Sequence, residues 1–353
     1  MILLKFFGNG KIELNHNSIR NYMADMLIMS AAPAAVSVYY YGWRAVLIIA
    51  ISALTAVICE YLACAITKKE NSLSDLSALF TGVIIALMLP VSVPLWMPAV
   101  GSAFAILVAK LPFGSTTKTP FVPAAAGLAF LIICWPTGMF KFPAPGAEVL
   151  AASDPLFVSE TSLAGMLKTG NSLSPDWFNY FDVFVGMIPG AMGTTSMLVC
   201  AALALYLLIR YPDRWISSAG FVAVCAFFAV IFPRVMSGRK MSLVMELASG
   251  MLLFCAIFLI TDPATQPASL ISKLLYGMSA GALCMLIRYV GPYEDGSVFA
   301  VLLINAVWPV IDPFIEKYLV SSGKHKKEKP EKKERKKAKK AFLKKKKEAE
   351  ING

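Results

Sequence analysis

The sequence is poor in charged residues and in histidine, and its cysteines are not spaced as metal ligands. Asp, Glu, Lys and Arg make up 16% of the 353 residues, against about 25% in soluble domains. The two histidines, His16 and His325, lie outside the long apolar runs, which argues against a haem held between two histidines. The 7 cysteines form no CxxC pair, so we expect no disulfide, zinc site or iron–sulfur cluster.

Long apolar runs are what the sequence has instead. Hydrophobic residues make up 57% of the chain, and runs long enough to cross a membrane recur from Met23 onward. We predict an all-α polytopic membrane protein with about ten transmembrane helices, some of them broken at proline. We predict no signal peptide in residues 1–22. The predicted spans are 23–41, 44–67, 76–90, 95–111, 122–136, 195–210, 215–232, 246–261, 273–290 and 297–314.

Two pairs of segments indicate an internal duplication. "DLSALFTGVIIALMLP" begins at Asp75 and resembles "ELASGMLLFCAIFLITDP", which begins at Glu246. "AAAGLAFLIICWP" ends at Pro136 and resembles "VLLINAVWP", which ends at Pro309, at nearly the same offset. With an odd number of spans in each copy, the second copy has the opposite orientation in the membrane. We therefore predict two inverted five-helix repeats with a functional centre near the membrane midplane.

The positions of Lys and Arg predict the orientation. More of them, including Lys110, fall on the side that holds both termini than on the side that holds Arg234 and Arg288. We predict a multi-pass protein of the cell (inner) membrane with both termini in the cytoplasm, and a basic tail that contacts the lipid bilayer, with no nucleic acid as partner. The predicted parts are a cytoplasmic N-terminal segment (1–22), a first repeat (23–136), an extracytoplasmic insertion (137–194), a second repeat (195–318) and a disordered Lys-rich cytoplasmic tail (319–353).

Four stretches carry a resemblance to a known family. They are "FLITDPATQPASLISKLLYGMSAGALCMLIRYVGPYEDGSVFAVLLINAVWPVID", "SIRNYMADMLIMSAAPAAVSVYYYGWRA", "DLSALFTGVIIALMLPVSVPLWMPAVGSAFAILVAK" and "DVFVGMIPGAMGTTSML". The chain resembles, over about residues 15–318, the D subunit of the Rnf ion-translocating ferredoxin:NAD+ oxidoreductase. That family includes the B subunit of the sodium-translocating NADH:quinone reductase. The resemblance implies ten helices in two inverted repeats and a flavin subunit of a larger electron-transport complex.

The family carries FMN in phosphoester linkage to a threonine, in an outer-loop motif close to S-G-A-T-P-L. The best match is "VSETSL", which places Thr161 at the flavin position, next to Ser159. Glu160 replaces a small residue and Ser162 replaces the usual proline. The resemblance implies covalent FMN on Thr161, attached by a flavin transferase, and a second flavin such as riboflavin. From the residues alone, Ser159 or Thr161 equally well caps a short helix.

A glycine-rich stretch, "GMIPGAMGTTSM", precedes the predicted span at 195–210. Gly190, Gly193, Thr194 and Thr195 lie in it. Free N–H groups at a helix start can hold a phosphate or a flavin oxygen, so we treat these residues as cofactor-binding candidates. A plain loop with a helix cap explains the pattern equally well.

Acidic residues next to or within apolar runs are candidates for an ion route. Glu60 lies inside a predicted span, and it either binds a cation or proton or pairs with a Lys or Arg. Asp262 precedes a proline, and Asp295 precedes the predicted span at 297–314. Each of these two also suits a structural turn or cap.

The function that these features predict is a flavin-bearing subunit of a redox-driven Na+ or H+ pump. The chain shows no nucleotide-binding fingerprint and no cysteine cluster, so other subunits must supply those parts. Two alternatives stand beside it: a standalone inverted-repeat channel or transporter, and a scaffold subunit without flavin. The coupling ion and the final electron acceptor, NAD+ or quinone, stay open at this point.

Overall fold

The computed structural model describes residues 16–67, 75–113, 119–148, 150–169, 180–235, 238–315 and 317–318. The predicted tail at 319–353 and residues 1–15 of the predicted N-terminal segment lie outside these ranges. The chain divides into two compact units, Met1–Val307 and Trp308–Gly353. In the second unit, residues 308–315 and 317–318 are helical. The helices and contacts that follow belong to the first unit, except that residues 308–315 of the helix Ser297–Ile315 belong to the second.

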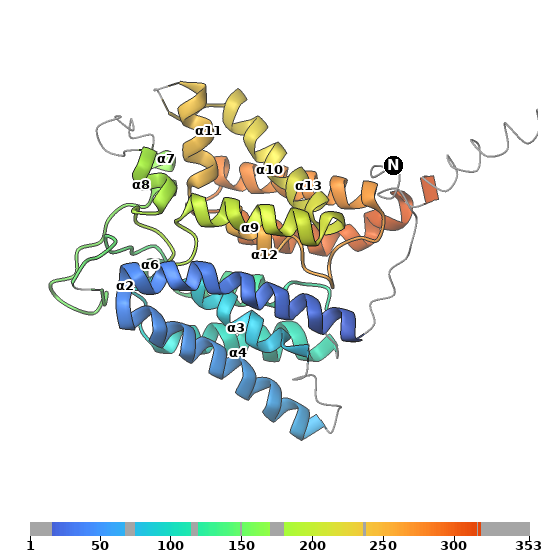
Figure 1. The fold of residues 1–353 in the computed structure, drawn as a ribbon, viewed down its shortest axis with the longest axis horizontal. Helices are drawn as coiled ribbons and strands as arrows, with labels where there is room; N and C mark the ends of the chain where they lie inside the picture. The colour runs from blue at the N-terminus through green and yellow to red at the C-terminus, as the bar shows by residue number, and fades with distance from the viewer. Residues whose placement is uncertain are drawn as a thin grey trace, which may run out of the picture. The chain divides into compact units, whose positions relative to one another are not determined.

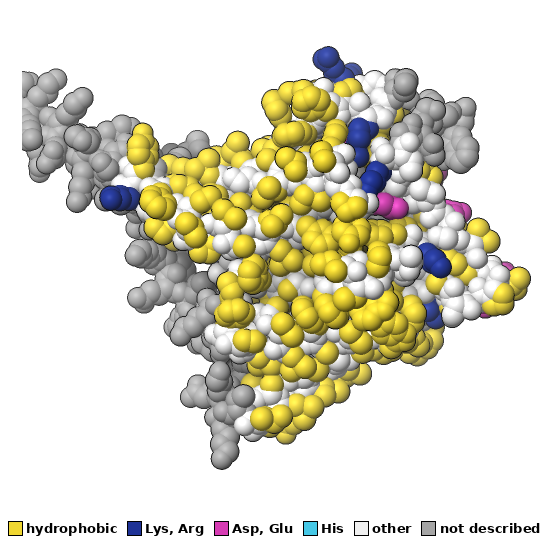
Figure 2. Space-filling model, turned by 180° about the vertical axis from the view of Figure 1, so that it is seen from behind, with side chains coloured by type: hydrophobic (Ala, Val, Ile, Leu, Met, Phe, Trp, Pro, Cys, Tyr) yellow, Lys and Arg dark blue, Asp and Glu magenta, His cyan; other side chains and the backbone are white. Residues whose placement is uncertain are grey.

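Helices account for all regular structure in the described ranges, apart from one isolated bridge between Phe142 and Glu160. The all-α class is therefore confirmed. Five described helices are long and apolar enough to cross a membrane, and a bent pair makes a possible sixth. Hydrophobic side chains cover most of the face shown in Figure 2, as expected for a protein surrounded by lipid. The five helices are Ile19–Ile66, Trp96–Phe113, Pro212–Ile231, Leu270–Val290 and Ser297–Ile315.

The first half of the chain packs around a long, broken helix. In α2 (His16–Thr67), Gly42 has φ 59 and ψ −143, which splits the helix where the predicted spans 23–41 and 44–67 meet. Gly82 of α3 (Ser77–Leu87) lets that helix approach α2 closely, because a Cβ at Gly82 would lie 2.7 Å from the Ala53 backbone. The other elements of this half are α3 (Ser77–Leu87), α4 (Trp96–Phe104), the π-helix η2 (Ala105–Lys110), η3 (Leu111–Phe113), α5 (Pro123–Cys134) and α6 (Pro136–Met139).

The second half contains α9 (Met197–Arg210), α10 (Pro212–Ile231), α11 (Arg239–Ala248), α12 (Leu252–Phe258) and α13 (Leu270–Val290). In Figure 1 these helices lie beside the group formed by α2, α3 and α4. The predicted span at 246–261 was wrong at its start. The helix begins at Arg239 and bends by 55° between α11 and α12. Gly250, with φ 64, lies in this break.

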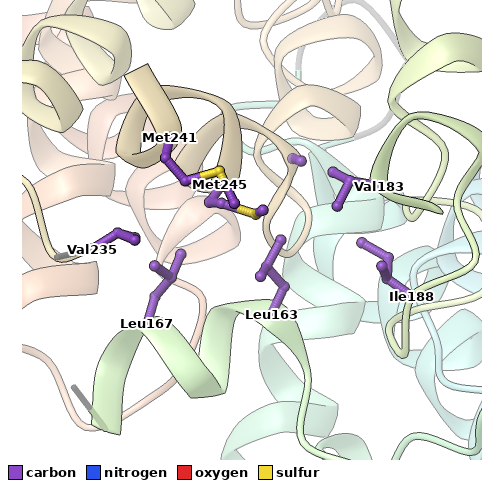
Figure 3. Packing of buried hydrophobic residues seen from close by; sticks show 8 residues of the cluster. Leu163, Leu167, Val183, Ile188, Val235, Met241 and Met245 are labelled. Carbon is purple, nitrogen blue, oxygen red and sulfur yellow. The ribbon is translucent and has the colours of Figure 1, made fainter. Parts of the chain in front are cut away.

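The segment between the halves contacts both of them. Its short helices are α7 (Leu163–Thr169) and α8 (Tyr180–Val185). On the first half, the Gly146 N–H donates to Tyr40 O at 3.1 Å and the Ala152 N–H donates to Ser92 O at 3.0 Å. On the second half, α7 packs into a buried apolar cluster. Leu163 and Leu167 point toward Met241 and Met245 of α11, with Val183, Ile188 and Val235 beside them (Figure 3).

Helix α13 packs against α10 through glycines one turn apart. A Cβ on Gly277 would lie 2.0 Å from Ser217 O, and one on Gly281 would lie 2.6 Å from Phe221 O. Both obstacles are backbone atoms, so a side chain at either position forces the helices apart. Small residues at such contacts let helix backbones approach closely in a membrane.

We expect Gly277→Ala to lower the free energy of unfolding by about 3 kcal/mol, because the added methyl group overpacks the contact with Ser217. Thermal unfolding of the detergent-solubilised chain measures the effect. Met278→Leu, a change at a 40% exposed neighbour, serves as control and should cost less than about 0.5 kcal/mol. A Gly277→Ala protein as stable as the wild type contradicts this helix contact.

Candidate functional site

Thr161 is exposed and lies between two neighbours that are held in place. The Glu160 N–H donates to Phe142 O at 2.8 Å. Ser162 is buried, accepts a hydrogen bond from the Gly165 N–H at 3.0 Å and donates one to Glu294 at 2.5 Å. Ser162 therefore caps α7, and not Ser159 or Thr161 as the sequence suggested. Ser159 is exposed like Thr161.

A groove runs beside the start of α7, and we call it the α7 groove. It brings together Gly190, Thr194, Thr195 and Asp295 with Ser162 and Glu294. Thr161, Ser159 and Gly193 are not among its lining residues. Glu294 and Asp295 are the ionisable ones among the residues that line it, and Asp295 is paired with Arg288. Its apolar walls come from Phe140, Phe142, Leu163, Ala164, Ile188, Pro189, Ala191, Ala248 and Met251.

The glycine-rich stretch uses its N–H groups within the fold. The Gly193 N–H donates to Leu87 O at 2.8 Å, and the Thr194 N–H donates to Ala191 O at 3.0 Å. These two groups are therefore not offered to a phosphate, in contrast to the idea that the sequence suggested. A Cβ on Gly193 would lie 2.7 Å from Leu87 Cβ, so the glycine allows a close approach to the end of α3. The N-cap of α9 is Ser196.

Glu60 belongs to a buried chain of polar groups that we call the Lys110 cluster. Lys110 Nζ lies 2.5 Å from Glu60 Oε1, and both side chains are almost completely buried. The same ammonium donates to Ser77 Oγ at 2.5 Å, and Ser77 Oγ donates to Asp75 at 2.6 Å. Of the two sequence interpretations, the observed contact is pairing with a lysine. Lys110 ends the π-helix η2, whose wider turn is a feature found often at functional sites.

Asp262 lies close to the same cluster. It is buried, and its Oδ1 accepts the Ala264 N–H at 2.8 Å, which makes a local turn at the proline. A second pocket is lined by Asp262, Ser77 and Lys110, among others. The structure therefore places two of the predicted ion-route carboxylates, Glu60 and Asp262, near one buried ammonium group.

Asp295 belongs to a separate set of buried charges, the Arg288 cluster, formed by Arg234, Glu246, Arg288 and Asp295. Arg234 binds Glu246 through two nitrogens, at 2.5 and 2.7 Å, and Arg288 Nη1 lies 3.5 Å from the same carboxylate. Arg288 Nε lies 3.4 Å from Asp295 Oδ1, which also accepts the Ser297 N–H at 2.9 Å. Asp295 is thus both a helix cap and an ion-pair partner.

Several residues of these sites were not candidates in the sequence, among them Lys110, Glu246, Arg288 and Glu294. Lys110 and Arg288 had been used only to predict the orientation, although each lies at the end of a helix and is buried. An available signal was Arg288 itself, in the apolar run "CMLIRYV", because a charge inside such a run needs a buried partner.

We expect Glu246→Ala to lower the free energy of unfolding by about 3–5 kcal/mol, since it leaves the buried Arg288 and its neighbour Arg234 without their shared carboxylate. Glu148→Ala, at an exposed carboxylate, is the matched control and should change stability by less than about 0.5 kcal/mol. Unfolding in detergent, followed by intrinsic fluorescence, compares the two. Equal stability of both variants would refute the structural importance of the cluster.

The chain is similar to the D subunits of ion-translocating oxidoreductase complexes. It is 30% identical over 292 residues to the D subunit of the proton-translocating ferredoxin:NAD(+) oxidoreductase complex of Clostridium ljungdahlii, covering 82% of this chain and 88% of the relative. It is 29% identical to the D subunit of the Na(+)-translocating ferredoxin:NAD(+) oxidoreductase complex of Acetobacterium woodii, covering 88% and 94%. The family model of NQR2, RnfD and RnfE matches residues 13–320. This chain therefore belongs to the NQR2, RnfD, RnfE family.

Proposed function

We propose that this chain is a flavin-bearing membrane subunit of a redox-driven, ion-translocating electron-transport complex of the ferredoxin:NAD+ oxidoreductase type. The observation that carries the proposal is the family match over residues 13–320, joined to an exposed hydroxyl at Thr161. The relatives described above are named as subunits of such complexes. One is named for protons and the other for Na+, and the proposal covers both ions.

Thr161 is the proposed site of covalent FMN, through a phosphoester formed by a flavin transferase. Its exposure supports this role, because a transferase must reach the hydroxyl group. The neighbouring Ser162 hydroxyl is buried and bound at both its donor and acceptor sides, so it is a poor acceptor. When bound, FMN supplies an electron-accepting ring. The phosphate is proposed to stay on the exposed segment that carries Thr161, because Thr161 is not among the residues that line the α7 groove.

We also propose the architecture of two inverted five-helix repeats. In support, the described helices fall into two sets on either side of the 137–194 insertion. The first set is the two parts of α2 divided at Gly42, then α3, α4 with η2, and α5. The second set is α9, α10, the bent pair α11 and α12, α13, and the helix Ser297–Ile315. Short and bent members within such sets are typical of transporters with inverted repeats.

Glu60, Asp262 and Asp295 are the proposed contributors to the Na+ or H+ route. All three carboxylates are buried, and such groups inside a membrane protein usually serve transport or pairing. Glu60 pairs with Lys110, and Asp262 lines the same pocket as Lys110. Asp295 pairs with Arg288. The remaining proposed partners are the other subunits of the complex and the bilayer, with riboflavin as a second flavin.

Cysteine labelling tests the proposed orientation. In a background without the native cysteines, Ser153→Cys should react with a membrane-impermeant reagent added outside intact cells, because residues 137–194 are proposed to lie outside. Ser322→Cys should react only after the membrane is opened. Labelling of Ser322→Cys in intact cells reverses the orientation.

Flavin attachment tests the cofactor proposal. Wild-type chain co-expressed with its transferase should show in-gel flavin fluorescence after denaturation, and an FMN-sized mass increment on the peptide that contains Thr161. Thr161→Ala should abolish both signals. Ser159→Ala is the matched control, because Ser159 is an exposed hydroxyl residue two positions away. An adduct that survives Thr161→Ala places the flavin elsewhere, and a wild type without adduct favours the scaffold subunit.

A further inference from the structure

Glu294 contacts the first turn of α7, directly after the proposed flavin acceptor. Its Oε2 accepts the Ser162 hydroxyl at 2.5 Å. A Cβ on Gly165 would lie 2.8 Å from Glu294 Oε1. The carboxylate therefore rests on a part of the helix that is free of side chains. It reaches the chain at the residue next to Thr161.

The contact with Glu294 completes a pair of anchors around Thr161. On one side, the backbone of Glu160 is bonded to Phe142. On the other side, the Ser162 hydroxyl is bonded to Glu294. Thr161 is exposed between them. An acceptor whose neighbours are already fixed loses less conformational entropy when an enzyme binds it.

Two more contacts hold α7 on the second half of the protein. Lys168 Nζ donates to Gly291 O at 2.9 Å, from the same loop that carries Glu294. Leu163 and Leu167 pack against Met241 and Met245 of α11 (Figure 3). These contacts remain when the Glu294 side chain is changed, so variants at Glu294 alter the anchor at Ser162 without removing α7 from its place.

We propose that Glu294 is the positioning residue for flavin attachment: by holding the Ser162 hydroxyl, its carboxyl group fixes the segment that presents Thr161 to the transferase. This inference rests on the proposed function, since it concerns the same acceptor. Glu294 does not touch the reacting hydroxyl and acts through Ser162.

The protonation of Glu294 gives this role a signature in pH. Burial raises the pKa of the Glu294 carboxyl, the Ser162 hydrogen bond and Lys168 lower it, and Asp295 raises it, with a net upward shift. The charged groups that face it are Lys168 from α7 and Asp295 from its own loop. The Glu294 carboxyl group binds its proton more tightly when it is buried against α7 than when it is solvated. The contact between Glu294 and α7 is therefore strongest at low pH and weakens as pH rises through the raised pKa. A neutral glutamine keeps the hydrogen-bond acceptor and removes this dependence.

The first experiment measures the rate of FMN attachment to the full-length chain in membranes, at limiting transferase. Glu294→Ala should slow attachment about tenfold, because Ser162 loses its partner. Glu294→Gln should stay within about twofold of the wild type and should lose the wild type's decline in rate with rising pH. Glu148→Ala, an exposed carboxylate of the same insertion, should match the wild type. Wild-type rates in Glu294→Ala, or equal losses in the Gln and Ala variants, overturn the proposal.

Gly165→Ala separates positioning from helix stability. Alanine favours the helix over glycine, so a purely structural role of this turn predicts unchanged or faster attachment. The added Cβ would lie 2.8 Å from Glu294 Oε1 and displace the carboxyl group. We expect attachment to slow severalfold, and a rate at or above wild type counts against Glu294 as the positioning residue.

Amide hydrogen exchange supplies a readout that needs no flavin. Exchange at residues 160–166 should rise several-fold in Glu294→Ala and in Ser162→Ala, and it should stay at the wild-type level in Glu294→Gln. Unchanged exchange in Glu294→Ala overturns the proposal even if the wild type carries no flavin. A wild type without adduct but with the expected exchange pattern refutes the proposed function and leaves the anchor at Ser162 supported.

Discussion

The need to pair charges that are buried away from water shapes this protein more than any other constraint. An uncompensated charge in a low-dielectric interior costs several kcal/mol. A buried Lys or Arg is therefore stable only where carboxylates pack against it. Lys110 joins the end of η2 to Glu60 of α2 and to Ser77 at the start of α3. Arg288 joins the end of α13 to Glu246 of α11 and to Asp295. Each cation thus fixes elements that are far apart in the chain.

The Arg288 cluster and the bend between α11 and α12 explain each other. A helix that breaks inside a membrane protein exposes carbonyl and N–H groups that need partners. Arg288 Nη2 donates to Ser249 O at 2.6 Å, and the Met251 N–H donates to Asp295 at 2.5 Å. Both backbone groups lie in the break. Gly250 lies between them, where a Cβ would meet Asp295 and Arg288 at 2.6 and 2.8 Å. The bend therefore depends on a glycine and an ion pair together.

The sequence predicted the elements better than their contacts. Hydropathy and proline located the breaks at Gly42 and after α5, because these signals are local. The bend after α11 was missed, since "RKMSLVMELA" is a polar start to a helix that hydropathy reads as loop. The partners of Glu60 and Asp295 were not predictable by position, because Lys110 and Arg288 reach them only through tertiary packing. Thr161 was proposed as the flavin site by resemblance alone, whereas its exposure and the contact between Ser162 and Glu294 required the structure.

The insertion connects these constraints to the proposed flavin site. It is bonded to Tyr40 and Ser92 of the first half, and α7 is bonded to Gly291 and Glu294 of the second. A change in how the two halves pack must therefore move or strain the segment that contains Thr161. Glu294 also adjoins Asp295 in the chain, so the acceptor segment connects to the buried Arg288 cluster through the Ser162–Glu294 hydrogen bond and the peptide bond between Glu294 and Asp295. An added charge on the segment that contains Thr161 would act on the Glu294 carboxyl group, and a moving charge in the Arg288 cluster would act on the Asp295 carboxyl group. Because these two carboxyl groups belong to neighbouring residues, the charge on one influences the protonation of the other.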